Sequence, residues 1–190
     1  MLSVHGSVMR GNYGPEETIE SAYLADAANG ATVLQIATAQ SLEAICHCVG
    51  EFSDASVLLS NQYPTVRIVE TEEIRAKTAA DHVLIHGKLV NDAAVSVRFR
   101  GGCNLAIRGC RVEISGTEGD LVLSGATPNM QWAALGVSGA RKDEHSLRAL
   151  PVPDRYLLQP PGLPHGPAQY LAHNYQAFQE ADYQRYRDRQ

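Results

Sequence analysis

The chain has 190 residues and a mass of 20.6 kDa, a length that suits one domain or one domain with appendages. Hydrophobic residues make up 44% and charged residues 19%, which is typical of a globular protein with a core. The net charge of −5 argues against non-specific nucleic-acid binding, which depends on neutralising phosphates. Neither a bilayer-spanning apolar run nor a secretory leader is evident. We therefore expect a soluble, cytoplasmic protein without nucleic-acid or membrane partners.

The first part of the chain predicts a strand, a loop and a long helix. Residues 1–9 alternate loosely as a strand does, and the glycines and proline of 10–15 favour a loop. Pro15-Glu16-Glu17 favours the start of a short helix, because proline and carboxylates suit a first helical turn. Residues 31–49 have a helical period, which Gly50 ends. The predicted apolar face of this helix consists of Val33, Ala37, Ala44, Ile45 and Cys48.

From residue 55 onward the hydrophobic period changes to two, the period of β-strands. Turn residues at 91–92 and 116–119 join neighbouring strands, as in an antiparallel meander. The predicted strands are 55–59, 66–68, 82–90, 94–100, 105–115 and 121–124, with edge strands at 132–137 and 147–152. Strands that follow one another without intervening helices predict the α+β class, with an open, mostly antiparallel sheet and helices packed on one face.

The end of the chain predicts a connector and a second helix. The three prolines of 159–164 stiffen the connector, and 167–187 carries an apolar stripe at helical spacing. We therefore expect one α/β domain over residues 1–165 and a C-terminal helix over 166–190.

The four cysteines are expected to be free thiols, since no secretory signal accompanies them. Cys46-His47-Cys48 resembles a set of metal ligands, but successive helical residues turn by about 100°, so Cys46 and Cys48 point to opposite sides. Zinc ligands are usually spaced more widely. We predict no metal site, and we interpret the cysteines, including Cys103 and Cys110, as small hydrophobic residues.

Common catalytic motifs are missing from the sequence. Gly-rich dinucleotide and phosphate-binding loops are absent, and Ser138 lacks the glycine spacing of a nucleophile elbow. His82 and His86 share a strand face, but at roughly 13 Å apart they are too distant for one metal ion. One polar stripe remains, with Gln40, Glu43 and His47 at helical steps of three and four. Such a stripe is more often the wet face of an amphipathic helix than a site.

Three stretches of the chain resemble one known family. They are Asn29–Phe52, Asp81–Gly102 and Glu113–Leu123, which agree with it in order and spacing. The family is that of the glucose–fructose oxidoreductases, inositol dehydrogenases and MocA proteins (Gfo/Idh/MocA), in the branch that includes the yeast galactose-regulon repressor. The resemblance covers residues 1–165 and only the C-terminal domain of that family, which lines the substrate site and supports oligomerisation.

The resemblance also implies what the chain lacks. The family's Rossmann domain, which binds NAD(P), and its catalytic lysine have no counterpart in this sequence, so we expect no cofactor to be bound by this chain alone. Active members carry Gly-x-His-x-x-Asp in the long helix, where the histidine transfers a proton. In this register Gln40 replaces the histidine and Glu43 the aspartate. An amide does not titrate near neutral pH and cannot act as a general acid or base, so we assign no catalytic residue.

The functional expectations follow from this resemblance. The first is a stand-alone or truncated C-terminal domain of an NAD(P)-dependent oxidoreductase that binds a sugar or polyol through Gln40, Glu43 and His47 without turning it over. A separate Rossmann-domain protein is then an expected partner. The alternative is a regulatory or protein-interaction module of the same fold. A third reading, an unrelated small α+β enzyme, has no visible nucleophile–base pair to support it.

The resemblance further implies self-association through the open face of the sheet. In the family this face packs against its counterpart in a neighbouring subunit, which predicts a homodimer here. The strand over 94–100 presents either Arg98 and Arg100 or its alternate apolar residues on that face. We predict that Arg98 and Arg100 lie at the interface.

Overall fold

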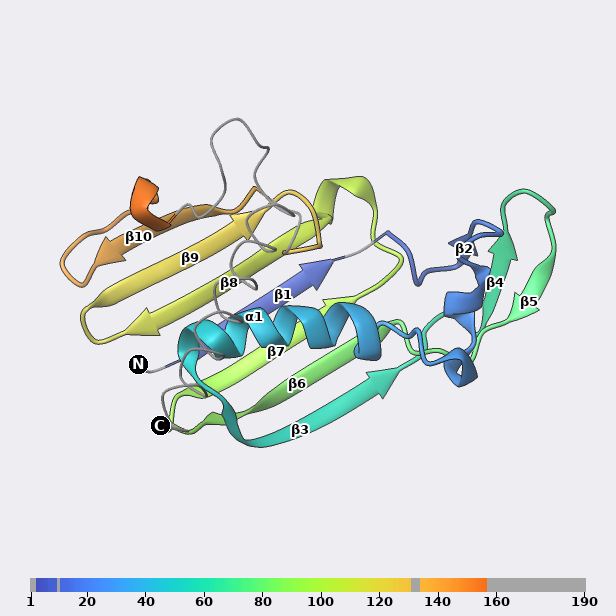
Figure 1. Cartoon of the computed structure of the whole chain (residues 1–190), viewed down its shortest axis with the longest axis horizontal. Coiled ribbons are helices and arrows are strands. Elements are labelled where there is room, and N and C mark those ends of the chain that lie inside the picture. Colours follow the sequence, from blue (N-terminus) through green and yellow to red (C-terminus); the bar gives the residue numbers. More distant parts are fainter. Residues whose placement is uncertain (1–2, 10, 131–133, 157–190) are drawn as a thin grey trace, which may run out of the picture.

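The computed structural model describes residues 3–9, 11–130 and 134–156. The predicted connector at 159–164 and the predicted helix at 167–187 lie outside these described residues. Most of the described chain forms one large sheet with a helix across one face, and a smaller sheet stands at one end (Figure 1). This arrangement confirms the predicted α+β class with an open, mostly antiparallel sheet.

The large sheet has eight strands. In hydrogen-bonding order they are β11 (Arg148–Ala149), β10 (Gly136–Arg141), β9 (Gly119–Gly125), β8 (Gly109–Gly116), β1 (Ser3–Met9), β7 (Ala94–Arg100), β6 (His82–Leu89) and β3 (Phe52–Ser60). The β6–β7 and β8–β9 hairpins match the prediction. The predicted meander is wrong between them, because β1 separates β7 from β8 and runs parallel to β7.

Some predicted boundaries also differ. Residues 105–107 form a short 3₁₀ turn, so β8 begins only at Gly109. The edge strand predicted at 132–137 begins at Gly136; residues 132–133 lie outside the described part. The strand predicted at 147–152 is only the two residues of β11.

The smaller sheet consists of β2 (Glu16–Glu17), β4 (Thr65–Ile68) and β5 (Ile74–Ala76). The short helix predicted at Pro15–Glu17 is wrong, because these residues pair in parallel with Arg67 and Ile68 of β4. Buried Glu17 instead accepts hydrogen bonds from the backbone N–H of Tyr13 at 2.5 Å and from the Ser21 hydroxyl at 2.6 Å. These contacts hold the segment extended.

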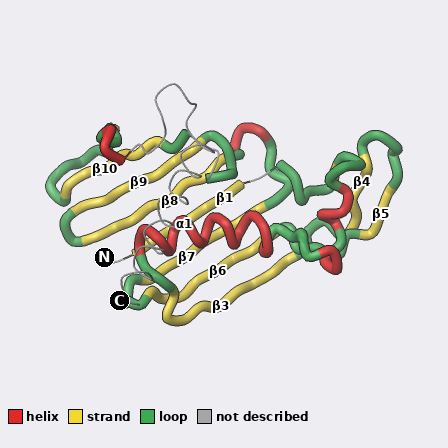
Figure 2. Tube along the Cα trace, viewed as in Figure 1, coloured by secondary structure: helices red, strands yellow, loops and turns green. Residues whose placement is uncertain are grey.

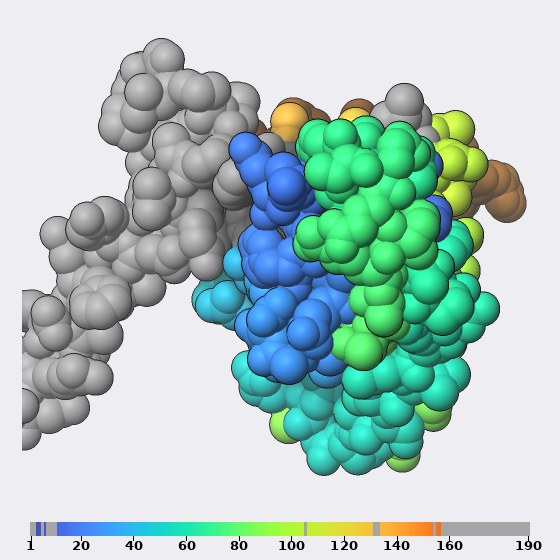
Figure 3. All heavy atoms as spheres, turned by 90° about the vertical axis from the view of Figure 1, so that its right-hand side faces the viewer, coloured from blue at the N-terminus to red at the C-terminus, as the bar shows by residue number. Residues whose placement is uncertain are grey.

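Two 3₁₀ turns, Ala22–Ala25 and Ala27–Asn29, cover one side of the small sheet. Ala25 packs with Val66 and Ile68 of β4 in a small buried cluster. In the space-filling view the blue N-terminal segment lies against the green β4–β5 region (Figure 3). The small sheet therefore combines two pieces of chain that are 51 residues apart at the paired positions Glu16 and Arg67.

The long helix is built in two parts, a π-turn at Leu34–Thr38 followed by α1 (Ala39–Val49). The backbone N–H of Thr38 bonds to the carbonyl of Val33, five residues back, at 2.8 Å. The extra residue of a π-turn changes which side chains face the sheet. The predicted apolar face is therefore partly wrong, since Cys48 is exposed and Val49 is buried in its place.

The core lies between α1 and one face of the large sheet (Figure 2). Ile45 and Val49 of α1 pack with Val4, Leu89 and Val95. Gly6 of β1 permits this approach, because a Cβ there would lie 3.4 Å from Ile45 Cδ1 and 3.2 Å from Val97 Cγ1. The register thus places the apolar alternates of β7 under the helix and its polar alternates on the open face.

Candidate functional site

Gln40, Glu43 and His47 all lie exposed on α1, on the side away from the core. The helix is held by its buried stripe, which repeats every fourth residue from Ala37 to Val49. None of the three polar side chains has a hydrogen-bond partner among the described residues. They are therefore free to bind a ligand that approaches the helix from outside the sheet.

The chemistry of this stripe is that of hydrogen bonding. The Gln40 amide offers donors and an acceptor, Glu43 offers acceptors, and His47 offers one of each when neutral. Thr38, at the start of α1, is fully buried, and its hydroxyl has no partner among the described residues. The three exposed side chains can recognise hydroxyls, whereas the buried Thr38 cannot reach a ligand on the outer side of α1. The Gln40 amide does not accept or release a proton at neutral pH.

Arg98 and Arg100 lie on the face of the sheet opposite α1. Leu84 pairs with Arg98, and His82 with Arg100, across the β6–β7 ladder, so all four share this face. Arg98 is exposed, while Arg100 is half-buried and its Nε has no hydrogen-bond partner among the described residues. The structure thus selects one of the two registers left open by the sequence, and it puts both arginines on the face that no described helix covers.

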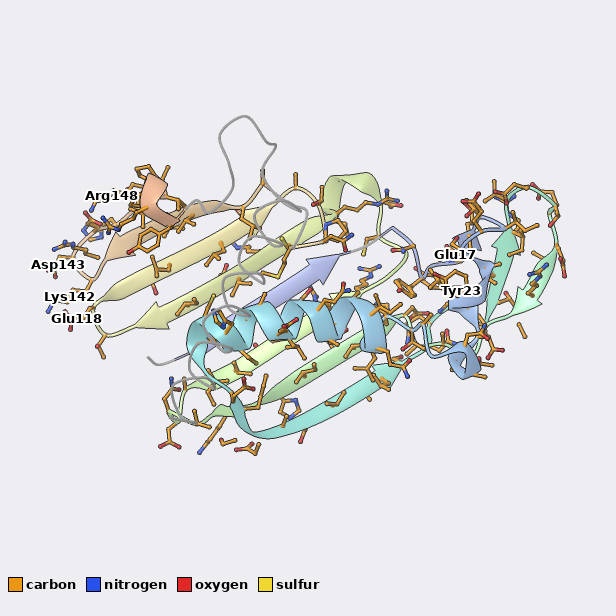
Figure 4. All side chains as sticks on the ribbon, in the orientation of Figure 1. Glu17, Tyr23, Glu118, Lys142, Asp143 and Arg148 are labelled. Carbon is orange, nitrogen blue, oxygen red and sulfur yellow. The ribbon has the colours of Figure 1, made fainter. Side chains whose placement is uncertain are left out.

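Two hollows occur at opposite ends of the described structure, and neither is lined by α1. One of about 400 Å³ is lined by residues of β9 and β10, by Glu118 in the turn before β9 and by Arg148 of β11. The other, of about 550 Å³, is lined by Tyr23, Arg75 and neighbours of the small sheet. Figure 4 shows the labelled residues Glu118 and Arg148 at the end opposite Tyr23. Because no residue of α1 lines either hollow, neither adds to the stripe on α1.

A buried ion pair that sequence reasoning missed joins the two sheets. Lys77, just after β5, contacts Asp81, just before β6, with 2.9 Å between Nζ and Oδ2, and the two side chains are 1% and 0% exposed. Lys77 also donates to the carbonyl of Ala79. Asp81 accepts hydrogen bonds from the backbone N–H groups of Gln62 and Tyr63 in the loop after β3. The pair therefore ties β4–β5 to the end of the large sheet.

Asp81 stays ionised because its partners outweigh its burial. Desolvation alone would raise the pKa of this carboxyl, but hydrogen bonds from Gln62, His82, Lys77 and Tyr63 together hold the pKa below its ordinary value. His82 Nδ1 lies 2.6 Å from Asp81 Oδ1. Because all of these partners belong to the protein itself, we assign the cluster a structural role.

The described residues do not fit a metal or NAD(P). No group of three His, Cys, Asp or Glu side chains among them is placed to hold a metal ion. In the same residues, no strand passes through a glycine-rich turn into a helix, the unit that binds a dinucleotide pyrophosphate. β1 leads instead into a loop and β2, and the π-turn follows a 3₁₀ turn. No reaction step through NAD(P) therefore follows from these residues.

The four free cysteines differ in accessibility, which predicts their order of reaction. Cys48 is exposed and Cys46 half-buried, with the Cys46 pKa raised by burial and by the charge of Glu51. Cys103 and Cys110 are buried, and burial also raises the pKa of Cys110. Since the thiolate is the reactive form, iodoacetamide should alkylate Cys48 first and Cys110 only after unfolding. Peptide mass spectrometry measures this order, and native-state labelling of Cys110 as fast as Cys48 would contradict it.

Comparison with known proteins identifies the family. The family model of the Gal80p C-terminal domain matches residues 1–125. The chain therefore belongs to the Gal80p C-terminal-domain-like family, as its resemblance to the repressor branch of the Gfo/Idh/MocA proteins predicts. No curated protein matches the chain. In the described part, no helix has the length and apolarity needed to cross a membrane.

Solved structures show the same fold. A super-repressor mutant of Gal80p from Saccharomyces cerevisiae has a TM-score of 0.76 at 19% identity, covering 97% of this chain and 47% of that chain. The transcriptional regulator Gal80p of Kluyveromyces lactis has a TM-score of 0.67 at 26% identity, covering 80% and 39%. Levoglucosan dehydrogenase in its apo form has a TM-score of 0.70 at 18% identity, covering 94% and 50%. The chain thus spans half or less of each neighbour.

Proposed function

We propose that this domain binds a sugar or polyol along α1 and does not itself transfer a proton to or from it. The observation that supports this most is the exposed stripe of Gln40, Glu43 and His47. By the family resemblance, Gln40 takes the position of a proton-transferring histidine, and its amide can bind a hydroxyl without titrating. Hydride transfer further needs a cofactor placed against the substrate. In this proposal any NAD(P) is held by a Rossmann domain, within the same protein or in a separate partner.

The ligand class can be tested with compounds that structural neighbours bind. Levoglucosan dehydrogenase has been solved with NADH and L-sorbose and with NADH and levoglucosan. Titration of the ¹⁵N-labelled chain with L-sorbose or levoglucosan should give saturating shifts at the amide signals of Gln40, Glu43 and His47. Shifts confined to another surface, or no shifts at millimolar ligand, would contradict the proposal.

A second candidate is a protein-interaction module that takes part in regulation. It is favoured by the family match to the C-terminal domain of Gal80p, whose K. lactis homologue is described as a transcriptional regulator. On this reading α1 or the open sheet face would contact another protein. Absence of any sugar-induced shift, together with retained folding, would favour this candidate over the first.

We also propose that the open face of the large sheet forms a twofold dimer. Exposed Arg98 and half-buried Arg100 lie on this face, which no described helix covers. Such an interface would bury about 1,600 Å² in total if it is of ordinary size.

Charge reversal at Arg98 tests this interface. Arg98→Glu should lower the mass of the assembly and leave the chain folded, because a change at an exposed strand position costs little stability by itself. Light scattering measures the mass of the particle, and Arg141→Glu, an exposed reversal at the end of β10, is the matched control. An assembly that Arg98→Glu leaves unchanged, or a wild-type monomer at high micromolar concentration, would contradict the proposed interface.

A further inference from the structure

The outer edge of β3 is an open strand edge with an apolar centre. β3 is the last strand of the large sheet and pairs with β6, and no described strand pairs with its other side (Figure 1). The strand is nine residues long. Its outer backbone N–H and C=O groups are therefore available for pairing with another chain.

At the centre of this edge, apolar side chains lie on both faces of the sheet. Val57, Leu58 and Leu59 are 52%, 57% and 47% exposed. Val57 and Leu59 pair with Ile85 and Val83, on the α1 side, whereas Leu58 pairs with Leu84 on the open side. The centre of the edge therefore exposes apolar surface on both faces of the sheet.

The usual protections of an edge strand occur only at the start of β3. A register shift between Phe52 and Asp54 interrupts the ladder there, and Asp54 is the only charged residue of the strand. Edges are normally blocked by charges, prolines or bulges. Residues 55–60 contain neither a charge nor a proline, so this half of the edge remains open to pairing.

We propose that this edge is an interaction surface for a second copy of the chain. The two β3 strands pair antiparallel about a twofold axis normal to the sheet at Leu58, which joins the two large sheets into one. This is a different surface from the open face, and the inference does not depend on sugar binding.

The sequence of β3 selects this register among its neighbours. Residues that face each other in an antiparallel pair point to the same face of the sheet. The twofold axis must therefore lie between a residue and its own copy, so that every other pair joins residues separated by an even number of positions. With the axis at Leu58, Leu58 meets its own copy, Val57 meets Leu59, and Ser56 meets Ser60. Centring on Val57 would place Leu58 against Ser56, and centring on Leu59 would place it against Ser60.

Charge also favours the antiparallel arrangement about Leu58. In this register Asp54 lies across from Gln62, far from the Asp54 of the other copy. A parallel, in-register pairing would instead place the two carboxylates next to each other, and like charges in facing strand positions are destabilising. The apolar centre and the separation of the charges therefore both favour antiparallel pairing centred on Leu58.

Cysteine cross-linking tests that geometry directly. In a Cys46→Ser, Cys48→Ser background, Leu58→Cys places two thiols directly opposite, with Cα atoms about 4.5–5.5 Å apart, a separation that suits a disulfide. Ser56→Cys is the matched control on the same strand and face, and its two thiols lie roughly 13 Å apart along the strand. Mild oxidation should give at least tenfold more covalent dimer for Leu58→Cys. Equal yields, or no dimer from Leu58→Cys, would overturn the proposal.

A second pair of variants separates this edge from the open face. Val57 points to the α1 side, so Val57→Lys added to Leu58→Cys should abolish cross-linking without altering the face that carries Arg98. Arg98→Glu added to Leu58→Cys should leave cross-linking intact. The reverse pattern would assign the contact to the open face and overturn edge pairing. Hydrogen exchange on the wild-type chain should show β3 amides that become more protected as protein concentration rises, and protection independent of concentration would count against it.

Discussion

Replacing Asp81 with alanine is expected to lower the free energy of unfolding by about 3–5 kcal/mol, the cost of leaving one charge of a buried pair unpaired. The variant would leave the buried Lys77 ammonium without its carboxylate partner and remove the acceptor for the backbone N–H groups of Gln62 and Tyr63. Urea unfolding followed by circular dichroism measures the loss.

The matched control is Glu73→Ala, which removes an exposed partner of Arg75 in the small sheet. Exposed ion pairs contribute about 0–1 kcal/mol, so this variant should unfold close to the wild type. An Asp81→Ala variant as stable as the control would show that the Lys77–Asp81 pair does not hold the two sheets together.

The same carboxylate predicts a loss of stability in acid. The folded pKa of Asp81 is depressed, so its contribution is complete at neutral pH and is lost as pH falls from the ordinary carboxyl pKa of about 3.9 toward the folded value. Unfolding midpoints measured from pH 6 to pH 2.5 should fall more steeply in the wild type than in Asp81→Asn. Parallel curves would contradict this assignment.

Phe99→Ala should destabilise the fold to a similar extent, by about 3–5 kcal/mol, through lost burial and the cavity it leaves. Phe99 is fully buried in a cluster that includes Tyr13 and Leu24 of the N-terminal segment and Val33 before the π-turn. This side chain thus packs where the sheet, the helix and the first loop meet.

The neighbouring strand supplies the control for this substitution. Leu84→Ala removes an apolar side chain that is 37% exposed on the open face, and it should cost far less. Urea midpoints for the two variants check the comparison. Equal losses of stability in the two variants would contradict the assignment of the main core to the α1 face of the sheet.

The strands were predictable because alternation is a local signal. Val95, Val97 and Phe99 alternate with polar residues, and β6 and β7 form close to the predicted bounds. Strand pairing is not local, so the hydrophobic alternation does not indicate that β1 lies between β7 and β8. The π-turn was also hidden, since one extra residue in a turn shifts a helical face without altering the composition.

The site is less visible in the sequence than the fold. Gln40, Glu43 and His47 share an exposed helix face as predicted, but their role as a binding site stays a prediction. Lys77 and Asp81 escaped notice because charged residues in a loop are usually solvated. One signal could have indicated them: Lys77 precedes the small residues 78–80, and Asp81 directly precedes a strongly alternating strand.

The most direct test of binding through α1 is the dissociation constant of one sugar measured for two glutamine variants. Gln40→Ala removes the amide of the proposed site. Gln62→Ala removes an exposed amide from the loop after β3 and keeps the backbone N–H that bonds to Asp81. NMR titration with L-sorbose should give an affinity at least tenfold weaker for Gln40→Ala and unchanged for Gln62→Ala. Equal dissociation constants for the two variants would contradict binding through α1.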